Sequence, residues 1–447
     1  MPRMRIVICC LIAFTLTIDF SLSLISAQAY WIVTGGQKKI AGLVFGLYDA
    51  STICISPLLS IYIAKGGSYN KIFVAGIVIN FIGNLLYAIA DYFSSWELIF
   101  AGRVVSGLGA TCVPLLMVFV ADVMESDKQA KVVGYIKYIA AVSRMLGPLI
   151  GSLLTFKWDF TGTLGKLLNI FTLVGWIPMV FDLICLILLY IFSSYFVRIN
   201  MDIRGNFRFQ EIIQVFWPIL LIGYLTTVLC WLFIGNAFLL ATHHYHIINN
   251  EHDLGKIYIT GLVGFVASFV MFICVRKTML DMIWFTCSIL LLSIGSCVFF
   301  FTESWAFHLG VGITTFAYGL MIPSLNIMNN NFGKQLKQYI GSYISFAISL
   351  ITIAQGLARF CGPAIFILFA NIIEDSNCDF SNPELYITSG CRIDNYYTQN
   401  GIYIAICTLF TVLSIIAMNK RNNQVSPFII IKNTDNINQL INDDQYV

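Results

Sequence analysis

Long apolar stretches, broken by short polar segments, recur along the chain from near the N-terminus to about residue 418. Each comes close to the roughly 20 residues that an α-helix needs to cross a bilayer. The first stretch is interrupted by Asp19 and is too long for the core of a signal peptide, so we expect it to be retained as a helix. The pattern predicts twelve transmembrane helices, over residues 6–30, 41–64, 72–92, 98–122, 132–156, 174–196, 214–241, 255–276, 280–301, 305–328, 340–373 and 400–418.

Composition agrees with an all-α polytopic membrane protein. Of the 447 residues, 58% are apolar and 11% are charged, and the mean hydropathy is +0.82. A net charge of +3 is too small to indicate a nucleic-acid partner. The nucleophile, zinc and phosphate motifs of common enzymes do not occur in the sequence. We therefore expect no enzyme activity, no cofactor and no metal.

A polar segment over residues 197–213 divides the predicted helices into six and six. The sequence thus predicts an N-terminal bundle over 1–196, a C-terminal bundle over 214–418, and a polar, Asn-rich tail over 419–447 that we expect to be disordered. Most of the 26 basic residues fall on the side of the termini and the central linker. The positive-inside rule therefore predicts that the linker and both termini are cytosolic.

An internal repeat supports two equivalent halves. The fifth predicted helix contains Arg144-Met-Leu-Gly147-Pro148, and the eleventh contains Arg359-Phe-Cys-Gly362-Pro363. The fifth and eleventh helices occupy the same position in two six-helix halves. Parallel repeats with a substrate site between them are one known transporter plan.

Seven charged residues fall inside predicted helices and away from the helix ends, where each costs about 2.5–3.5 kcal/mol if it faces lipid at the helix centre. They are Asp19, Asp49, Arg103, Lys137, Arg144, Asp182 and Arg359. Most must face a cavity or one another. The residues that we expect to act in transport or coupling are Asp19, Asp49, Arg103, Lys137, Arg144 and Arg359.

Different roles follow from the chemistry of these groups. Asp19 and Asp49 can take up and release protons. Arg103 and Arg144 can supply the neighbouring cation or bind an anionic substrate through the guanidinium fork. Polar residues beside Asp19 and Asp49, at helical spacing, fit the walls of a wet cavity. The alternative is that these residues form hydrogen bonds between helices without any transport role.

Glycine and proline mark positions where helices can pack closely or bend. The candidate gating and packing residues are Gly107, Gly109, Gly147, Pro148, Gly362 and Pro363. Cys378 and Cys391 share one loop on the predicted non-cytosolic side, where a thiol pair can oxidise to a disulfide.

Two segments resemble signatures of the major facilitator superfamily. Arg103-Val-Val-Ser-Gly107-Leu-Gly109-Ala110 resembles the Arg-x-x-x-Gly-x-Gly-Ala signature of the fourth helix, and Gly147-Pro148-Leu-Ile-Gly151 resembles the Gly-Pro-x-x-Gly signature of the fifth. Asn84-Leu-Leu-Tyr87-Ala88 and the segments around Arg103 and Gly147 are also similar to the lysosomal domain-containing protein 8 subfamily, associated with neuronal ceroid lipofuscinosis.

The resemblance implies twelve helices, a cavity lined mainly by helices 1, 4, 7 and 10, and residence in the endolysosomal membrane. By that analogy Asp19 and Arg103 lie near the cavity, and chloride conductance has been attributed to the subfamily. One departure concerns the loop after the second helix. The superfamily usually has an Asp there in a Gly-x-x-x-Asp-Arg-x-Gly-Arg-Lys pattern, whereas this chain has Ala64. The gate that this acid latches must be built differently or be weaker.

The sequence predicts a secondary carrier of a small solute or ion that rocks two bundles around a central site. It leaves open whether the substrate is an anion and whether transport is coupled to protons. The alternatives are an anion channel on the same scaffold and a receptor or scaffold protein that does not transport. We expect a monomer in contact with the lipid bilayer.

Overall fold

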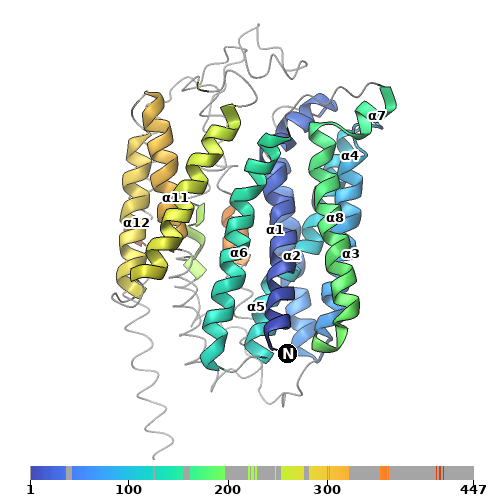
Figure 1. Ribbon diagram of the computed structural model, residues 1–447, viewed down its shortest axis with the longest axis horizontal. Coiled ribbons are helices and arrows are strands. Elements are labelled where there is room, and N and C mark those ends of the chain that lie inside the picture. Colours follow the sequence, from blue (N-terminus) through green and yellow to red (C-terminus); the bar gives the residue numbers. More distant parts are fainter. Residues whose placement is uncertain are drawn as a thin grey trace, which may run out of the picture.

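The computed structural model describes residues 2–36, 43–123, 126–154, 162–196, 253–275, 281–299 and 303–321. It also describes positions 247 and 301 and parts of 220–228, 353–361 and 409–416. The regular structure among these residues is helical (Figure 1). Bilayer lipid offers no hydrogen-bond partners to the backbone, and helices satisfy these groups internally.

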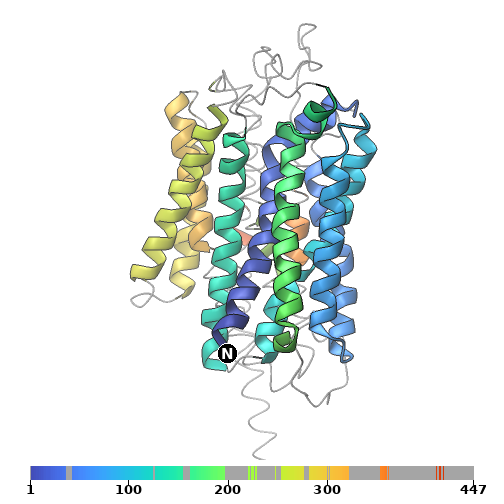
Figure 2. The same cartoon turned by 45° about the vertical axis from the view of Figure 1, so that its right-hand side comes forward.

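The N-terminal half is an upright bundle (Figures 1 and 2). Its helices are α1 (Pro2–Val33), α2 (Leu43–Ala64), α3 (Tyr69–Ala88), α4 (Trp96–Ala110), α5 (Cys112–Val123), α6 (Ser126–Leu153), α7 (Gly162–Leu167) and α8 (Ile170–Ile191), followed by the 3₁₀ turn η2 (Ser193–Phe196). The C-terminal half contributes α11 (Asp253–Val275), α12 (Asp281–Val298) and a helical segment over 304–321. Another short helical segment covers 353–359.

Five helical spans in the described part of the chain are long and apolar enough to cross a membrane. They are Met4–Ser23, Gly46–Ile63, Tyr69–Ala88, Trp96–Val120 and Phe171–Ile191. The helix α6 is more polar, because it carries Lys128, Lys131, Lys137 and Arg144. It nevertheless lies beside α1 in the bundle (Figures 1 and 2). Of these four residues Arg144 has a described side chain, and it is only partly exposed.

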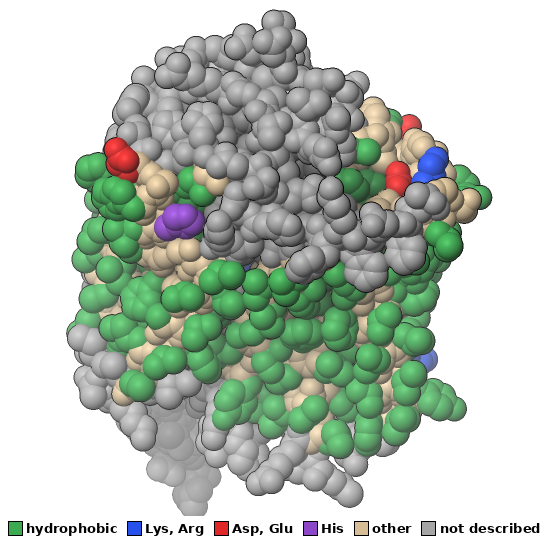
Figure 3. Space-filling model, turned by 45° about the horizontal axis from the view of Figure 1, so that its top comes forward, with side chains coloured by type: hydrophobic (Ala, Val, Ile, Leu, Met, Phe, Trp, Pro, Cys, Tyr) green, Lys and Arg blue, Asp and Glu red, His purple; other side chains and the backbone are tan. Residues whose placement is uncertain are grey.

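Lipid-facing and interior surfaces are separated most clearly on α8. Val180, Leu183, Ile187 and Tyr190 are exposed on one face, and Tyr190 retains 85% of its accessible surface. On another face of the same helix, Asp182 is fully buried. Figure 3 shows hydrophobic side chains over most of the described surface of one side, with acidic and basic side chains near its upper edge. A helix in a bilayer places apolar side chains toward the lipid and polar side chains toward the protein interior, because a polar group that faces lipid has no hydrogen-bond partner.

The helix α1 lies at the centre of the N-terminal half, where it packs against α6 and α8, while α3 packs against α4 and α8. An apolar cluster that includes Ile12, Phe73 and Phe119 joins α1, α3 and α5. A second cluster around Tyr30, Trp31 and Tyr87 lies toward the other end of α1. The contact of α6 with α11 joins the described parts of the two halves.

Helix boundaries differ from the predicted ones in two informative places. The predicted helix over 98–122 is divided into α4 and α5 at Thr111. Pro114 has no N–H and its ring crowds the carbonyl of Ala110, so it favours a break at this point. The short helix α7 was not predicted, because its six residues are too few and too polar to give a transmembrane pattern.

The starts of α4 and α8 are fixed by side-chain caps. The Ser95 hydroxyl accepts from Leu98 N at 3.4 Å. The Asn169 side chain accepts from Phe171 N at 2.9 Å and from Thr172 N at 3.0 Å. Asn169 also donates to Asp91 Oδ2 at 2.6 Å, which ties the beginning of α8 to the turn after α3. These bonds satisfy N–H groups that the helix itself leaves unpaired.

The central linker at 197–213 and the tail at 419–447 lie outside the described residues, so the predicted domain boundaries stay predictions. The same holds for Gly362, Pro363, Cys378 and Cys391. Lys137 and Pro148 lie on α6, but their side chains are outside the described set.

Candidate substrate site between the two halves

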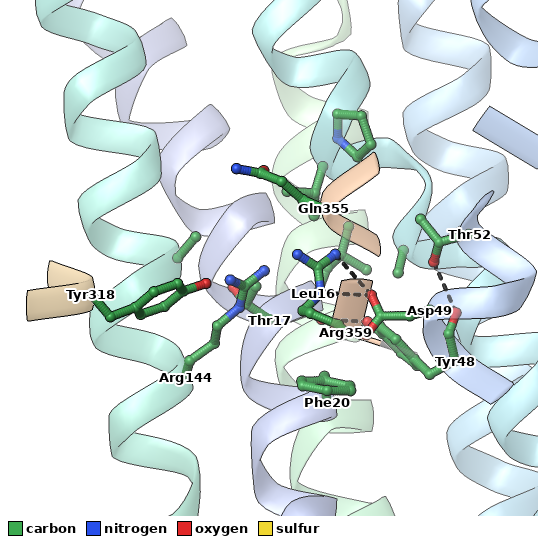
Figure 4. Close-up of a pocket in the computed structure, with 14 residues that line it drawn as sticks. Leu16, Thr17, Phe20, Tyr48, Asp49, Thr52, Arg144, Tyr318, Gln355 and Arg359 are labelled. Atoms are coloured by element: carbon green, nitrogen blue, oxygen red, sulfur yellow. Dashed lines mark hydrogen bonds and ion pairs between the residues drawn. The ribbon is translucent and has the colours of Figure 1, made fainter. Parts of the chain in front are cut away.

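A cavity of about 70 Å³ lies between the halves (Figure 4). One water needs about 15 Å³ by this measure, so the cavity has room for about five water-sized groups. Its walls come from α1, α2, α6, the junction of α4 and α5, and the segments 304–321 and 353–359. The polar lining residues are Thr17, Tyr48, Asp49, Thr52, Arg144, Tyr318, Gln355 and Arg359.

Asp49 and Arg359 form an ion pair across this cavity. Asp49 Oδ1 accepts from Nη2 of Arg359 at 2.8 Å and from Nε at 2.9 Å. The two side chains are 5% and 9% exposed, so the pair is largely shielded from water. The residues belong to different halves, and therefore this bond joins the halves directly.

Arg144 projects from α6 into the same cavity, and Figure 4 places it between Tyr318 and Arg359. The described part of the chain gives Arg144 no ion pair, and its buried Nε has no hydrogen-bond acceptor there. Asp49 is already paired with Arg359, and the described lining contains two guanidinium groups but one carboxylate. Arg144 is therefore left without a carboxylate partner in this lining. Arg144 is only partly exposed, and an unpaired cation that is partly removed from water is costly. A bound anion would reduce that cost.

The structure brings the two copies of the internal repeat to the same place. Arg144 and Arg359 are its two arginines, and both line one cavity. The sequence did not single out Tyr318 or Gln355 as site residues. Gln355 lies four residues before Arg359, at the spacing that places two side chains on one helix face. Tyr318 lies in an apolar segment whose sequence gives no comparable signal.

Asp19 and Arg103 lie inside the N-terminal bundle and do not line the cavity. Arg103 Nη2 is 3.4 Å from Asp19 Oδ1, and the side chains are 1% and 0% exposed. The guanidinium also lies over the ring of Tyr87, 4.4 Å from its centroid. Thr15, on the same helix as Asp19, contacts the Cys185 sulfur at 3.2 Å. This face of α1 is thus turned toward α4 and α8, whereas Thr17 and Phe20 face the cavity.

Small residues allow the helices around the site to approach closely. A Cβ on Gly109 would lie 2.7 Å from Asn80 N, and a Cβ on Gly147 would lie 2.6 Å from Leu22 N. Gly107 lies against the Tyr48 carbonyl, next to the cavity. Thr52 Oγ1 donates to the Gly107 carbonyl at 2.8 Å, which fastens α2 to α4 behind Asp49. Contacts between small residues are the usual means of close helix association in membranes.

The described residues contain no group of three or more His, Cys, Asp or Glu side chains placed to hold a metal ion. The polar groups that line the cavity act through hydrogen bonding and charge. Residues 9–370 match the Major Facilitator Superfamily. The chain belongs to this superfamily. The all-α polytopic architecture is the major facilitator fold, which is the fold of a family of membrane transporters and not of enzymes.

Other comparisons agree at the level of fold. The solved structure of the human organic anion transporter MFSD10 (TETRAN) superposes with a TM-score of 0.64, covering 92% of this chain and 99% of that one at 13% identity. Two SPX domain-containing membrane proteins of Arabidopsis thaliana are 29% identical over 165 residues and 28% identical over 173 residues. These matches cover 35% and 36% of this chain, and the chain spans only 21% and 22% of the relatives' length.

The cavity partly follows the arrangement that the family resemblance implies. The first, fourth and tenth predicted helices contribute Thr17, Ala110 and Tyr318. The second and fifth predicted helices contribute Asp49 and Arg144, which are the charged residues of the N-terminal half at this site. The seventh predicted helix lies largely outside the described residues.

Proposed function

We propose that this transporter is a secondary active carrier of a small anion, working by alternating access around the central cavity. The observation that carries the proposal is Arg144, a guanidinium that faces the cavity without an ion pair in the described part of the chain. A guanidinium recognises carboxylate or phosphate through two parallel hydrogen bonds. The limited volume of the cavity favours a small substrate.

In this mechanism the Asp49–Arg359 pair is a latch between the halves. An anion that binds Arg144 lies next to Arg359 and competes with Asp49 for its guanidinium. Weakening the pair removes a direct bond between the halves, and the ligand then favours the conformation in which the latch is open. The absence of the superfamily's usual acid at Ala64 is compatible with a latch located at mid-membrane.

Proton coupling and an endolysosomal location are part of the proposal. Asp19, paired with Arg103 at 3.4 Å in a dry interior, is a carboxylate that can gain a proton when Arg103 moves away. The resemblance of the Asn84, Arg103 and Gly147 segments to the lysosomal domain-containing protein 8 subfamily supports the location. The similar fold of an organic anion transporter supports organic anions as the first substrates to test.

Flux through the purified full-length protein tests this function. Proteoliposomes are loaded in turn with radiolabelled lactate, succinate, phosphate and chloride, at two lumenal pH values. A carrier gives saturable uptake and counterflow of at least one of these anions, and the rate depends on the pH gradient if protons are coupled. A large voltage-driven chloride current would instead establish the channel alternative. Neither flux nor current with the anion panel would overturn the proposal in favour of a receptor or scaffold.

Location is tested separately. The tagged chain is expressed in cells and compared with lysosomal, endosomal and plasma-membrane markers, with the N-terminus and the tail probed from the cytosolic side. Endolysosomal staining with both ends accessible from the cytosol is the expected result.

A further inference from the structure

A second buried polar site lies in the N-terminal half, outside the residues that line the central cavity. Asp182 on α8 is fully buried and faces two asparagines of α3. Asn80 Nδ2 donates to both carboxyl oxygens, at 3.1 Å and 2.9 Å, and Asn84 Nδ2 is 3.3 Å from Oδ2. Asn80 and Asn84 are themselves fully buried. The carboxyl group is thus held by two neutral amides.

The charged and titratable groups around Asp182 come from every helix packed nearby. They are Asp19 of α1, Tyr48 of α2, Tyr87 of α3, Arg103 of α4 and Cys185 of α8 itself. Arg103 is the cation among these described groups, and it is paired with Asp19. The network therefore contains two carboxylates and one guanidinium.

Charge balance in such a dry site decides the protonation state. An isolated ionised carboxylate costs several kcal/mol even after the surroundings relax. Two ionised carboxylates would leave one charge uncompensated, whereas one added proton makes the network neutral. Asp19 keeps its charge because it has Arg103, so the proton belongs on Asp182.

The two amides are suited to either state of the acid. The Oδ1 atoms of Asn80 and Asn84 are buried and have no hydrogen-bond partner among the described residues. In the observed orientation each amide donates from its NH₂ group, which suits an ionised carboxylate. A half-turn of one amide group would instead present its oxygen, which can accept from the O–H of a protonated carboxyl group. Asn84 also lies beside Asp19, so it stands between the two acids.

We propose that Asp182, with Asn80 and Asn84, is a proton-binding site that carries one proton and shares it with Asp19. In the transfer the O–H bond on Asp182 breaks and an O–H bond on Asp19 forms, while the negative charge moves from Asp19 to Asp182. Arg103 stays protonated throughout, and its distance from Asp19 sets which acid holds the proton. A role in coupling rests on the proposed carrier function, whereas the occupancy of the site does not.

Infrared spectroscopy of the full-length protein in a detergent without ester groups, in the absence of substrate, tests the site directly. A protonated carboxylic acid gives a carbonyl stretching band that is separate from the bands of ionised carboxylates. We expect this band in the wild type at neutral pH, its loss in Asp182→Asn, and its retention in Glu303→Gln, which removes an exposed carboxylate. Absence of the band in the wild type, or its survival in Asp182→Asn, would overturn the proposal.

Arg103→Gln tests the sharing between the acids. Without the guanidinium neither carboxylate has a cation, so both should be protonated and the area of the band should about double. An unchanged band in this variant would show that Arg103 does not control the site. These spectra are recorded without a substrate anion, so their result does not depend on the outcome of the flux experiments on the central cavity.

Discussion

Asp49 and Arg359 are 310 residues apart in the sequence, and a guanidinium nitrogen of Arg359 lies 2.8 Å from the carboxylate of Asp49. Both residues line the cavity between the N-terminal and C-terminal halves of the chain. The pair is mostly buried, so it is a structural bond between the halves, and under the proposed mechanism transport must break it.

Removing one partner of this pair should be worse than removing both. Asp49→Asn leaves Arg359 buried without its carboxylate, a situation that typically costs about 3–5 kcal/mol. The double variant Asp49→Asn/Arg359→Gln leaves no uncompensated charge. We expect the melting temperature in detergent to fall in each single variant and to recover partly in the double variant. Strictly additive losses would show that the two residues do not act as a pair.

Transport should require the positive charge of Arg144. Arg144→Gln removes the group that we assign to anion binding, and we expect it to abolish saturable uptake while the protein still reaches its membrane. Arg144→Lys is the matched control, since it keeps the charge and loses the bidentate geometry. We expect this variant to retain measurable uptake with KM raised by about tenfold, the loss of about 1.4 kcal/mol. Wild-type uptake in Arg144→Gln would contradict the assignment.

The pair formed by Asp19 and Arg103 should affect transport without affecting delivery to the membrane. Asp19→Asn keeps the size of the side chain and removes its charge, and we expect loss of transport with normal localisation. Uptake at two pH values and microscopy of the tagged protein measure the two properties separately. Uptake in Asp19→Asn that matches the wild type at both pH values would make this pair purely structural.

Close helix packing at Gly109 should be sensitive to a single methyl group. An added Cβ would lie 2.7 Å from Asn80 N, so Gly109→Ala forces α3 and α4 apart, and overpacking of this kind costs about 1–3 kcal/mol. Gly134 on α6 is the control, because no atom of another described segment lies within 4 Å of a Cβ built there. Gly134→Ala should leave the melting temperature unchanged or raise it slightly. Equal melting temperatures for the two variants would contradict the packing argument.

Much of the architecture was predictable, because a helix that crosses the bilayer needs roughly 20 mostly apolar residues. The apolar stretches at 6–30, 41–64 and 72–92 correspond to α1, α2 and α3, with ends that differ by a few residues. The break at Thr111 was harder to predict, since Pro114 at the start of a helical turn is compatible with a kink as well as an interruption. Hydropathy also ranks α6 as the least membrane-like crossing, although it packs beside α1.

Of the site, the sequence by itself determined which charges must be buried: lipid makes a lone charge so costly that Asp49, Arg144 and Arg359 had to face the interior. Only the tertiary structure decided their partners. Helical periodicity fixes the face of a side chain on its own helix, but not which distant helix packs against that face. Thus Asp49 meets Arg359 rather than Arg144, Asp19 meets Arg103 away from the cavity, and Asp182 meets two asparagines instead of a cation.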